Sequence, residues 1–112
     1  MTRSDLPGTF EQLVLLALVR LGEQAYGVSV QREIERRSGR DVSLGAVYAT
    51  LERMEEKGWV RSRTGAATAE RGGRAKRHYR IEASGSRALR EAIAALDRMR
   101  ADLPGLAQAG GA

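Results

Sequence analysis

Residues 43–60 read SLGAVYATLERMEEKGWV, and they decide the fold because the hydrophobic period changes within them. Ser43 suits a helix N-cap and Gly58 a helix stop, so the segment predicts a helix from Ser43 to Lys57. Its apolar positions keep helical spacing and define a buried stripe: Leu44, Val47, Leu51 and Met54. Trp59 follows the stop and is expected to anchor the next segment to the core.

The chain downstream of Gly58 predicts a β-hairpin, with strands at 59–64 and 76–81. In the second strand, Tyr79 and Ile81 share one face, and His78 and Arg80 share the other, polar face, which we expect to point to solvent or phosphate. The strands are joined by a basic, glycine-containing loop. We therefore expect a hairpin with a long cationic tip.

Two more helices precede this segment. Thr9 and Gln12 have the spacing of a capping box, which predicts a helix over 10–21. That helix is apolar on almost every face, so it needs cover on two sides, and a second subunit is a plausible source of cover in so small a domain. A second helix is expected from about Tyr26 to Ser38, ending at Gly39.

A fourth helix is expected over 83–101. Its apolar residues alternate steps of three and four, which is enough for a helix seam between subunits. The predicted fold is mainly α with a two-stranded β-hairpin: a winged helix-turn-helix plus a C-terminal dimerisation helix. We divide the chain into a DNA-binding domain at 1–82, a dimerisation helix at 83–103 and a flexible tail at 104–112.

The charge is concentrated in one region. Residues 61–80 hold seven basic side chains and one acidic side chain, whereas the other 92 residues carry a net −1. Such segregation favours a nucleic-acid partner. The longest apolar run, 13–19, is far shorter than the roughly 20 residues of a membrane span. With one histidine and no cysteine, the chain suggests no catalytic group, metal site or cofactor, so we expect it not to be an enzyme.

The helix at 43–57 is the expected recognition element, because its outward side is small enough to approach DNA closely. Opposite the buried stripe lie Gly45, Ala46, Ala49, Thr50 and Arg53, with Tyr48 at the stripe's edge. The basic loop is expected to contact phosphates, which adds affinity but little sequence information. The ordinary alternatives are a tolerated small-residue helix start and a solvated charged loop.

Four motifs in this order give the chain a resemblance to the PadR family of transcriptional regulators, in its short subfamily with one C-terminal helix. They are GTFEQLVLLAL, AYGVSVQREIERRSG, SLGAVYATLERMEEKGWV and GGRAKRHYRI. The resemblance implies a homodimeric, usually repressing, DNA-binding protein, and many members release DNA when a small molecule binds near the dimer interface. Two departures from the family pattern matter. Where members often have Leu-Thr before the last helix, this chain has Ile81-Glu82, so the N-cap of that helix is expected to move to Ser84. There is no tryptophan in the first or fourth helix, so the tryptophan-lined drug pocket of some relatives is not supported.

The resemblance places DNA-backbone contact at Tyr26 and Gly27, and it matches Ser43, Gly45 and Tyr48 to the start of the recognition helix. The full set expected to bind DNA is Tyr26, Gly27, Ser43, Leu44, Gly45, Ala46, Tyr48, Ala49, Arg53, Arg71, Gly72, Gly73, Arg74, Lys76 and Arg77. The set expected to form the dimer is Phe10, Leu13, Leu16, Leu89, Ala92, Ile93, Leu96, Met99 and Leu103.

The expected function is that of a sequence-specific DNA-binding regulator, a homodimeric repressor of a pseudo-palindromic double-stranded operator. A small hydrophobic effector at the dimer interface would release it. Its expected place is the cytoplasm, at the nucleoid, with no membrane partner. The alternative is a protein-interaction adaptor that uses its apolar first and fourth helices, with an incidental basic loop.

Overall fold

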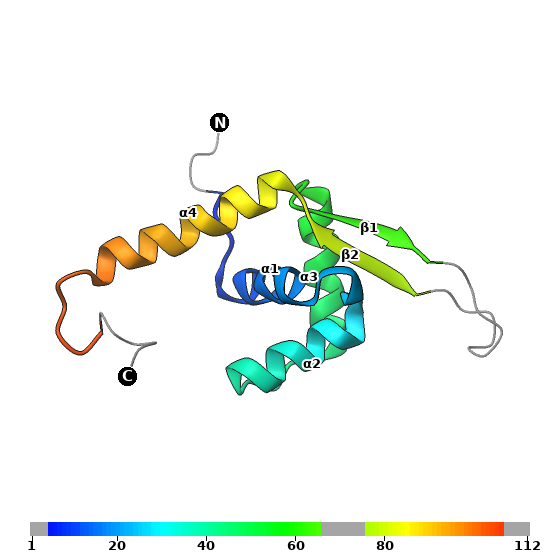
Figure 1. The fold of residues 1–112 in the computed structure, drawn as a ribbon, viewed down its shortest axis with the longest axis horizontal. Helices are drawn as coiled ribbons and strands as arrows, with labels where there is room; N and C mark the ends of the chain where they lie inside the picture. Colours follow the sequence, from blue (N-terminus) through cyan, green and yellow to red (C-terminus); the bar gives the residue numbers. More distant parts are fainter. Residues whose placement is uncertain (1–4, 66–75, 107–112) are drawn as a thin grey trace.

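The computed structural model describes residues 5–65 and 76–106. Within these residues the order of elements is α1 (Thr9–Leu21), a 3-10 turn η1 (Gly22–Gln24), α2 (Gly27–Ser38), α3 (Leu44–Glu56), β1 (Val60–Thr64), β2 (Arg77–Ile81) and α4 (Ala83–Arg100). The prediction of a mainly helical winged helix-turn-helix followed by a C-terminal helix is confirmed. Figure 1 shows α1, α2 and α3 in the middle, with the hairpin and α4 extending to opposite sides.

The start of α1 differs from the predicted capping box. Gly8 is the N-cap, and its backbone N–H donates to Glu11 Oε1 at 2.9 Å. Gln12 instead donates through Nε2 to the carbonyl oxygen of Pro7 at 3.0 Å. The capping interaction therefore begins one residue earlier than predicted, and it uses a carboxylate, which the positive end of the helix dipole favours over a neutral amide.

The core lies where the three central helices meet the hairpin. Its fully buried large side chains are Leu15, Leu51, Met54, Val14, Val30 and Val47. Trp59 and Tyr79 add the hairpin to this core, being only 6% and 4% exposed. The expected role of Trp59 as an anchor is confirmed, and the burial of Tyr79 gives it the same role. The base of the hairpin is thus fixed to the helical body.

β2 also pairs on its second edge with the segment just before α2, which the sequence did not reveal. β1 and β2 pair antiparallel, with Val60 opposite Ile81 and Thr64 opposite Arg77. On the other side of β2, the backbone N–H of Tyr79 donates to the carbonyl oxygen of Ala25 at 2.9 Å, and Tyr26 forms an isolated bridge with His78. The residue before α2 is thereby tied to the hairpin.

α4 begins at Ala83, with Glu82 rather than Ser84 as its N-cap. Ser84 uses its hydroxyl to donate to the carbonyl oxygen of Gly58 at 2.6 Å, so it links α4 to the end of α3. A Cβ on Gly85 would lie 2.2 Å from the carbonyl oxygen of Trp59, so glycine permits a close approach here. α4 then packs beside α1 through its first half and extends beyond the body in its second half (Figure 1).

Candidate nucleic-acid interface

The first turn of α3 presents a small and open surface. Ser43 caps the helix as predicted, its Oγ accepting from the backbone N–H of Ala46 at 3.0 Å. Gly45, Ala46 and Ala49 are exposed, and a Cβ added at Gly45 would meet no atom within 4 Å. A helix start with short side chains and free N–H groups can approach an anionic surface closely.

One member of the predicted outward face is misplaced. Thr50 is only 3% exposed, because it lies on the buried side of α3 between Val47 and Leu51 in helical register. Leu44 is half-buried. The outward face is therefore narrower than predicted, and it is centred on the first two turns.

Tyr48 connects α3 to the start of α2. Its side chain packs against Gly27 so closely that a Cβ on that glycine would lie 2.3 Å from the Tyr48 hydroxyl oxygen. Tyr48 is nevertheless 38% exposed, so it also reaches the surface. The structure thus brings together three residues from two parts of the sequence that were expected to contact DNA: Tyr48, Gly27 and the preceding Tyr26.

Tyr26 lies between two residues of the hairpin. The Nζ of Lys76 is 4.0 Å from the centroid of the Tyr26 ring, a cation–π contact. The His78 ring meets it edge-on, with 5.6 Å between centroids. His78 is half-buried, and its Nδ1 has no hydrogen-bond partner among the described residues. The expectation that His78 points freely to solvent or phosphate is corrected, because Tyr26 covers it.

Lys76 and Arg77 are the wing residues that the structure places. Lys76 is half-buried beside Tyr26, and Arg77 is exposed at the tip end of β2. Arg71, Gly72, Gly73 and Arg74 lie outside the described residues, so their predicted phosphate contacts remain predictions. Lys76 lies against Tyr26 just before α2, and the neighbouring Gly27 packs against Tyr48 of α3, so one placed cation is linked to both helices.

Arg53 has a partner inside the protomer. Its Nε lies 3.3 Å from Glu11 Oε2, and Lys57 Nζ lies 3.5 Å from the same oxygen. Burial alone would raise the pKa of Glu11, but the Gly8 N–H, Arg53 and Lys57 together lower it. Arg53 is therefore held toward α1, and its contact with DNA stays a prediction that this ion pair does not favour.

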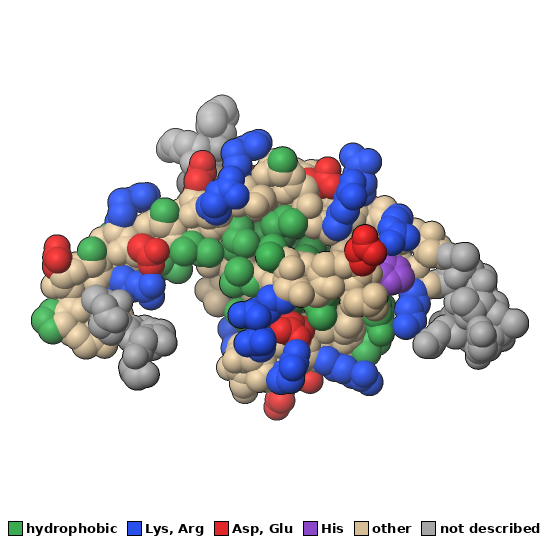
Figure 2. Space-filling view, viewed as in Figure 1, with side chains coloured by type: hydrophobic (Ala, Val, Ile, Leu, Met, Phe, Trp, Pro, Cys, Tyr) green, Lys and Arg blue, Asp and Glu red, His purple; other side chains and the backbone are tan. Residues whose placement is uncertain are grey.

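The residues expected to form the dimer divide into two groups. Leu89 and Ala92 are buried, packed in the protomer's own core beside α1, because the first half of α4 lies on the body. Phe10 and Leu13 are half-buried. The large apolar residues left exposed on α1 and beyond the middle of α4 are Leu16, Val19, Ile93, Leu96, Met99 and Leu103. Figure 2 shows apolar side chains gathered on one face between α4 and the central body.

Val19 is a member of this exposed group that the sequence reading left out of the dimer set. It is 56% exposed at the C-terminal end of α1. The first helix is apolar on almost every face, so its periodicity does not distinguish an exposed residue such as Val19 from a core residue.

Other kinds of site find little support in the part of the chain that the structure describes. No helix there is long and apolar enough to cross a membrane. No group of three or more histidine, cysteine, aspartate or glutamate side chains gathers there in a way that could hold a metal ion.

Comparison with known proteins identifies the family of the chain. The family model described as "Transcriptional regulator PadR-like family" matches residues 15–91. No curated protein sequence matches the chain at a significant level.

Solved structures match closely in fold. A PadR family transcriptional regulator from Eggerthella lenta is similar at 26% identity and a TM-score of 0.64, covering 79% of this chain and 74% of that one. A transcriptional regulator from Thermoplasma acidophilum has 25% identity and a TM-score of 0.64, with 79% and 82% covered. A PadR-like regulator from Bacillus cereus, at 21% identity, a TM-score of 0.63 and 80% and 82% coverage, supports the fold alone.

Proposed function

Because the chain belongs to the PadR-like family of transcriptional regulators, which are not enzymes, we propose that it is a homodimeric repressor that binds a pseudo-palindromic operator. The observation that carries the proposal is the continuous surface made by the first turn of α3, the Tyr26–Gly27 start of α2 and Lys76 of the hairpin. These three elements come from separate parts of the sequence, and the side chains that they present on this surface are mostly short or cationic. Its place of action is the cytoplasm, on chromosomal DNA.

In this proposal, α3 enters the major groove by its N-terminal half. Gly45, Ala46 and Ala49 let the helix backbone lie close to the base edges, and Tyr48 supplies a phenol at the side of the helix. Side chains at the start of a recognition helix read base edges in winged and other helix-turn-helix proteins. Sequence preference therefore comes mainly from this turn.

Affinity comes from contacts to phosphates around the groove. In this proposal, Lys76 and Arg77 bind phosphates beside the groove. The contacts predicted for Arg71 and Arg74 fall on residues outside the described part of the chain. Each phosphate neutralised by a cation adds to the steepness with which binding falls as salt rises. These contacts carry little sequence information.

The exposed apolar residues of α1 and the second half of α4 are the proposed dimer surface. A twofold dimer would place two copies of α3 on one side, with half-sites about one helical turn of DNA apart. The boundary between residues 82 and 83 stays a prediction. The buried Leu89 and Ala92 make the first half of α4 part of the DNA-binding unit's core. In this proposal, a small hydrophobic molecule that binds at the dimer interface releases the protein from DNA.

A mobility-shift titration on the DNA upstream of the protein's own gene, across a series of salt concentrations, tests the proposal. We expect binding at least tenfold tighter than to random duplex. Equal affinity for both duplexes contradicts a sequence-specific regulator. Light scattering of the purified protein distinguishes the regulator from the adaptor alternative. A stable homodimer favours the regulator, whereas a monomer that pairs only with another protein favours the adaptor.

A matched pair of variants tests the division of labour within the interface. Tyr48→Ala should weaken operator binding and alter the preferred sequence, because it removes a group beside the base edges. Arg77→Ala should weaken binding to operator and random duplex alike and lower the salt dependence by about one ion. A loss confined to the operator in Arg77→Ala, or spread evenly over both duplexes in Tyr48→Ala, contradicts the assignment.

A further inference from the structure

The hairpin is held on both of its edges at one strand pair, Ser62 opposite Tyr79. On the β2 side, the backbone N–H of Tyr79 donates to the carbonyl oxygen of Ala25 at 2.9 Å. On the β1 side, the backbone N–H of Ser62 donates to Glu55 Oε2 at 3.2 Å, and the Ser62 hydroxyl donates to the same oxygen at 2.8 Å. The segment before α2 and the last turn of α3 therefore hold the same strand pair from opposite sides.

The turn at Gly58 brings β1 back beside the end of α3. Gly58 has a φ of 82°, and its N–H donates to the carbonyl oxygen of Glu55 at 3.0 Å. Glu55 thus ends the helix through its backbone and binds the returning strand through its side chain. Because an edge strand leaves outward N–H groups without a strand partner, the carboxylate supplies an acceptor that the sheet itself does not provide.

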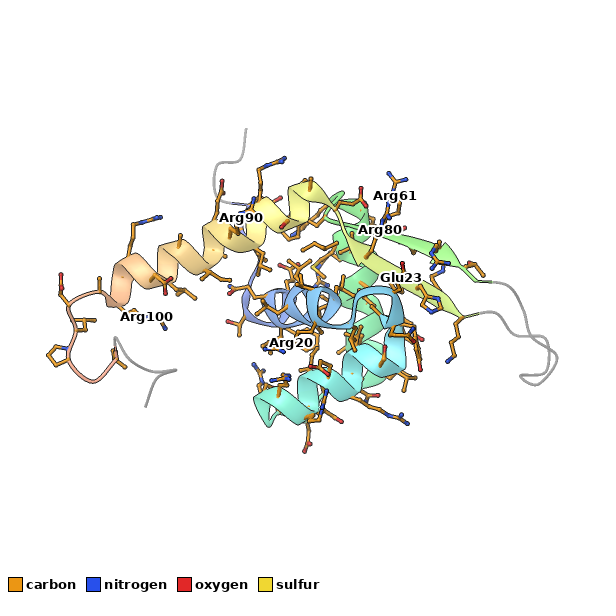
Figure 3. All side chains as sticks on the ribbon, in the orientation of Figure 1. Arg20, Glu23, Arg61, Arg80, Arg90 and Arg100 are labelled. Carbon is orange, nitrogen blue, oxygen red and sulfur yellow. The ribbon has the colours of Figure 1, made fainter. Side chains whose placement is uncertain are left out.

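Glu55 is a half-buried carboxylate that accepts both of its described hydrogen bonds from Ser62. It forms no ion pair with a described residue, although the hairpin is rich in arginine. The arginines of the opposite hairpin face have another partner, because Nε of Arg61 and of Arg80 lie 3.7 and 3.5 Å from Glu82 Oε2. Figure 3 shows these two arginines projecting together, away from α2. Glu55 therefore holds the strand rather than neutralising charge.

The held strand pair lies next to side chains proposed to contact DNA. Arg77 is two positions before Tyr79 in β2, so the two share one face of the strand. Burial raises the pKa of the Tyr79 phenol, Arg77 opposes this and Glu55 adds to it, so the phenol is within electrostatic reach of both. Tyr48 precedes Glu55 by about two helical turns, on the same side of α3. A shift of β1 against α3 would therefore move Arg77 relative to Tyr48.

We propose that Glu55 is a positioning residue for DNA binding, which fixes the angle between α3 and the hairpin so that Tyr48 and Arg77 reach the groove and the adjacent phosphate together. Its contribution is preorganisation, because a hairpin already in place loses less freedom when DNA binds. This role rests on the DNA-binding function proposed above, whereas the hold on Ser62 does not. By charge alone, removing a carboxylate near phosphates should strengthen binding, so a weaker complex is specific to the lost hydrogen bonds.

The hold on the strand is tested first in the full-length protein without DNA. Glu55→Met keeps the length of the side chain but has no carboxylate oxygen, so amide hydrogen exchange at Ser62 should accelerate at least about tenfold. The amides of Lys76 and Arg77 should have lower order parameters in 15N relaxation than in wild type. Glu56→Met, at the exposed next position, is the matched control and should leave both measurements unchanged. Unchanged exchange at Ser62 in Glu55→Met overturns the proposal.

Operator binding then tests the positioning role. Glu55→Met should bind operator about tenfold more weakly, because the hairpin must be ordered during binding. Glu56→Met removes the same charge and should bind as tightly as wild type or slightly more tightly. Glu55→Gln keeps an oxygen that can accept from Ser62 and should stay within about threefold of wild-type affinity. No loss in Glu55→Met, equal losses in the two methionine variants, or an equal loss in Glu55→Gln overturns the proposal.

A double-mutant cycle separates positioning of the hairpin from a general loss of structure. If Glu55 acts through Arg77, the pair Glu55→Met and Arg77→Ala should bind at least about threefold more tightly than the product of the single losses predicts. Independent, multiplying losses contradict this action. Ser62→Ala removes the hydroxyl donor but keeps the backbone donor, and it should give a smaller loss that is also non-additive with Arg77→Ala. It replaces Glu55→Met in the cycle if thermal melting shows that variant to be unfolded, and full affinity in Ser62→Ala then overturns the proposal.

Failure of the regulator proposal gives a different result. If wild type binds operator and random duplex equally, the sequence-specific regulator is contradicted, and the cycle with Arg77→Ala is run on random duplex. A protein that binds neither duplex removes both the regulator and the DNA role of Glu55. Hydrogen exchange at Ser62 decides in either case whether Glu55 holds the hairpin.

Discussion

A single methyl group added at two glycines should have opposite effects on stability. Gly45 is the second residue of α3 and is exposed, with no atom within 4 Å of an added Cβ. Gly85 is buried near the start of α4, where the added Cβ would lie 2.2 Å from the Trp59 carbonyl oxygen. The chemical change is the same, so the difference depends only on the surroundings.

The magnitudes follow from these surroundings. Gly45→Ala restricts the unfolded chain and suits a helix, so the free energy of unfolding should rise by about 0.5 kcal/mol and Tm by about 2 °C. Gly85→Ala forces α4 away from a backbone atom that cannot rotate aside, so the free energy of unfolding should fall by about 2 kcal/mol and Tm by about 8 °C.

Guanidinium denaturation followed by Trp59 fluorescence measures both effects. Fluorescence anisotropy with operator DNA then supplies the functional reading. Gly45→Ala should bind DNA about tenfold more weakly although it is more stable, because the methyl group lies where α3 approaches the bases. Unchanged DNA affinity in Gly45→Ala refutes the close approach of this turn. A stable Gly85→Ala refutes the packing of α4 on Trp59.

Two further predictions concern the ion pairs of α1 and the dimer. Glu11→Gln should lower the free energy of unfolding by about 1 kcal/mol at neutral pH. The lowered pKa of Glu11 means that its contribution is present above the ordinary value of 4.5 and is lost as pH falls through the lowered pKa, so denaturation curves of wild type and variant should converge in acid. Leu96→Glu should give a folded monomer in light scattering, with Arg98→Glu on the same helix as a control that stays dimeric. A dimeric Leu96→Glu would remove α4 from the proposed interface.

The elements of the fold could be predicted because their signals are local. Helical spacing within α3 and strand alternation in β2 depend on residues a few positions apart, and Ser43 and Gly58 bound the helix by their own backbone and side-chain chemistry. The errors in the predicted helix starts were also local, because in each case two nearby residues were candidates for the capping role. Glu11 rather than Gln12 completes the cap of α1, and Glu82 rather than Ser84 precedes α4.

The composition of the site was less predictable than its elements. The family resemblance pointed to Tyr26 and Gly27, and Tyr48 was also indicated by its place at the edge of the buried stripe, but nothing in the sequence showed that the three residues would meet. Their contact depends on how α2 crosses α3, and the Gly27–Tyr48 packing shows why a larger residue would not fit there. Arg53 counted as an outward cation in the sequence, yet it pairs with Glu11, 42 positions away.

The sequence by itself determined the order of helices and strands, the concentration of charge in residues 61–80 and the family of regulators that the chain resembles. Only the tertiary structure decided which half of α4 is core, that Tyr26 covers His78, and that Ala25 pairs with Tyr79 on the second edge of β2. The physical reason is range. Periodicity and capping act over one or two turns, whereas these contacts join residues tens of positions apart, and their formation depends on the path of the whole chain.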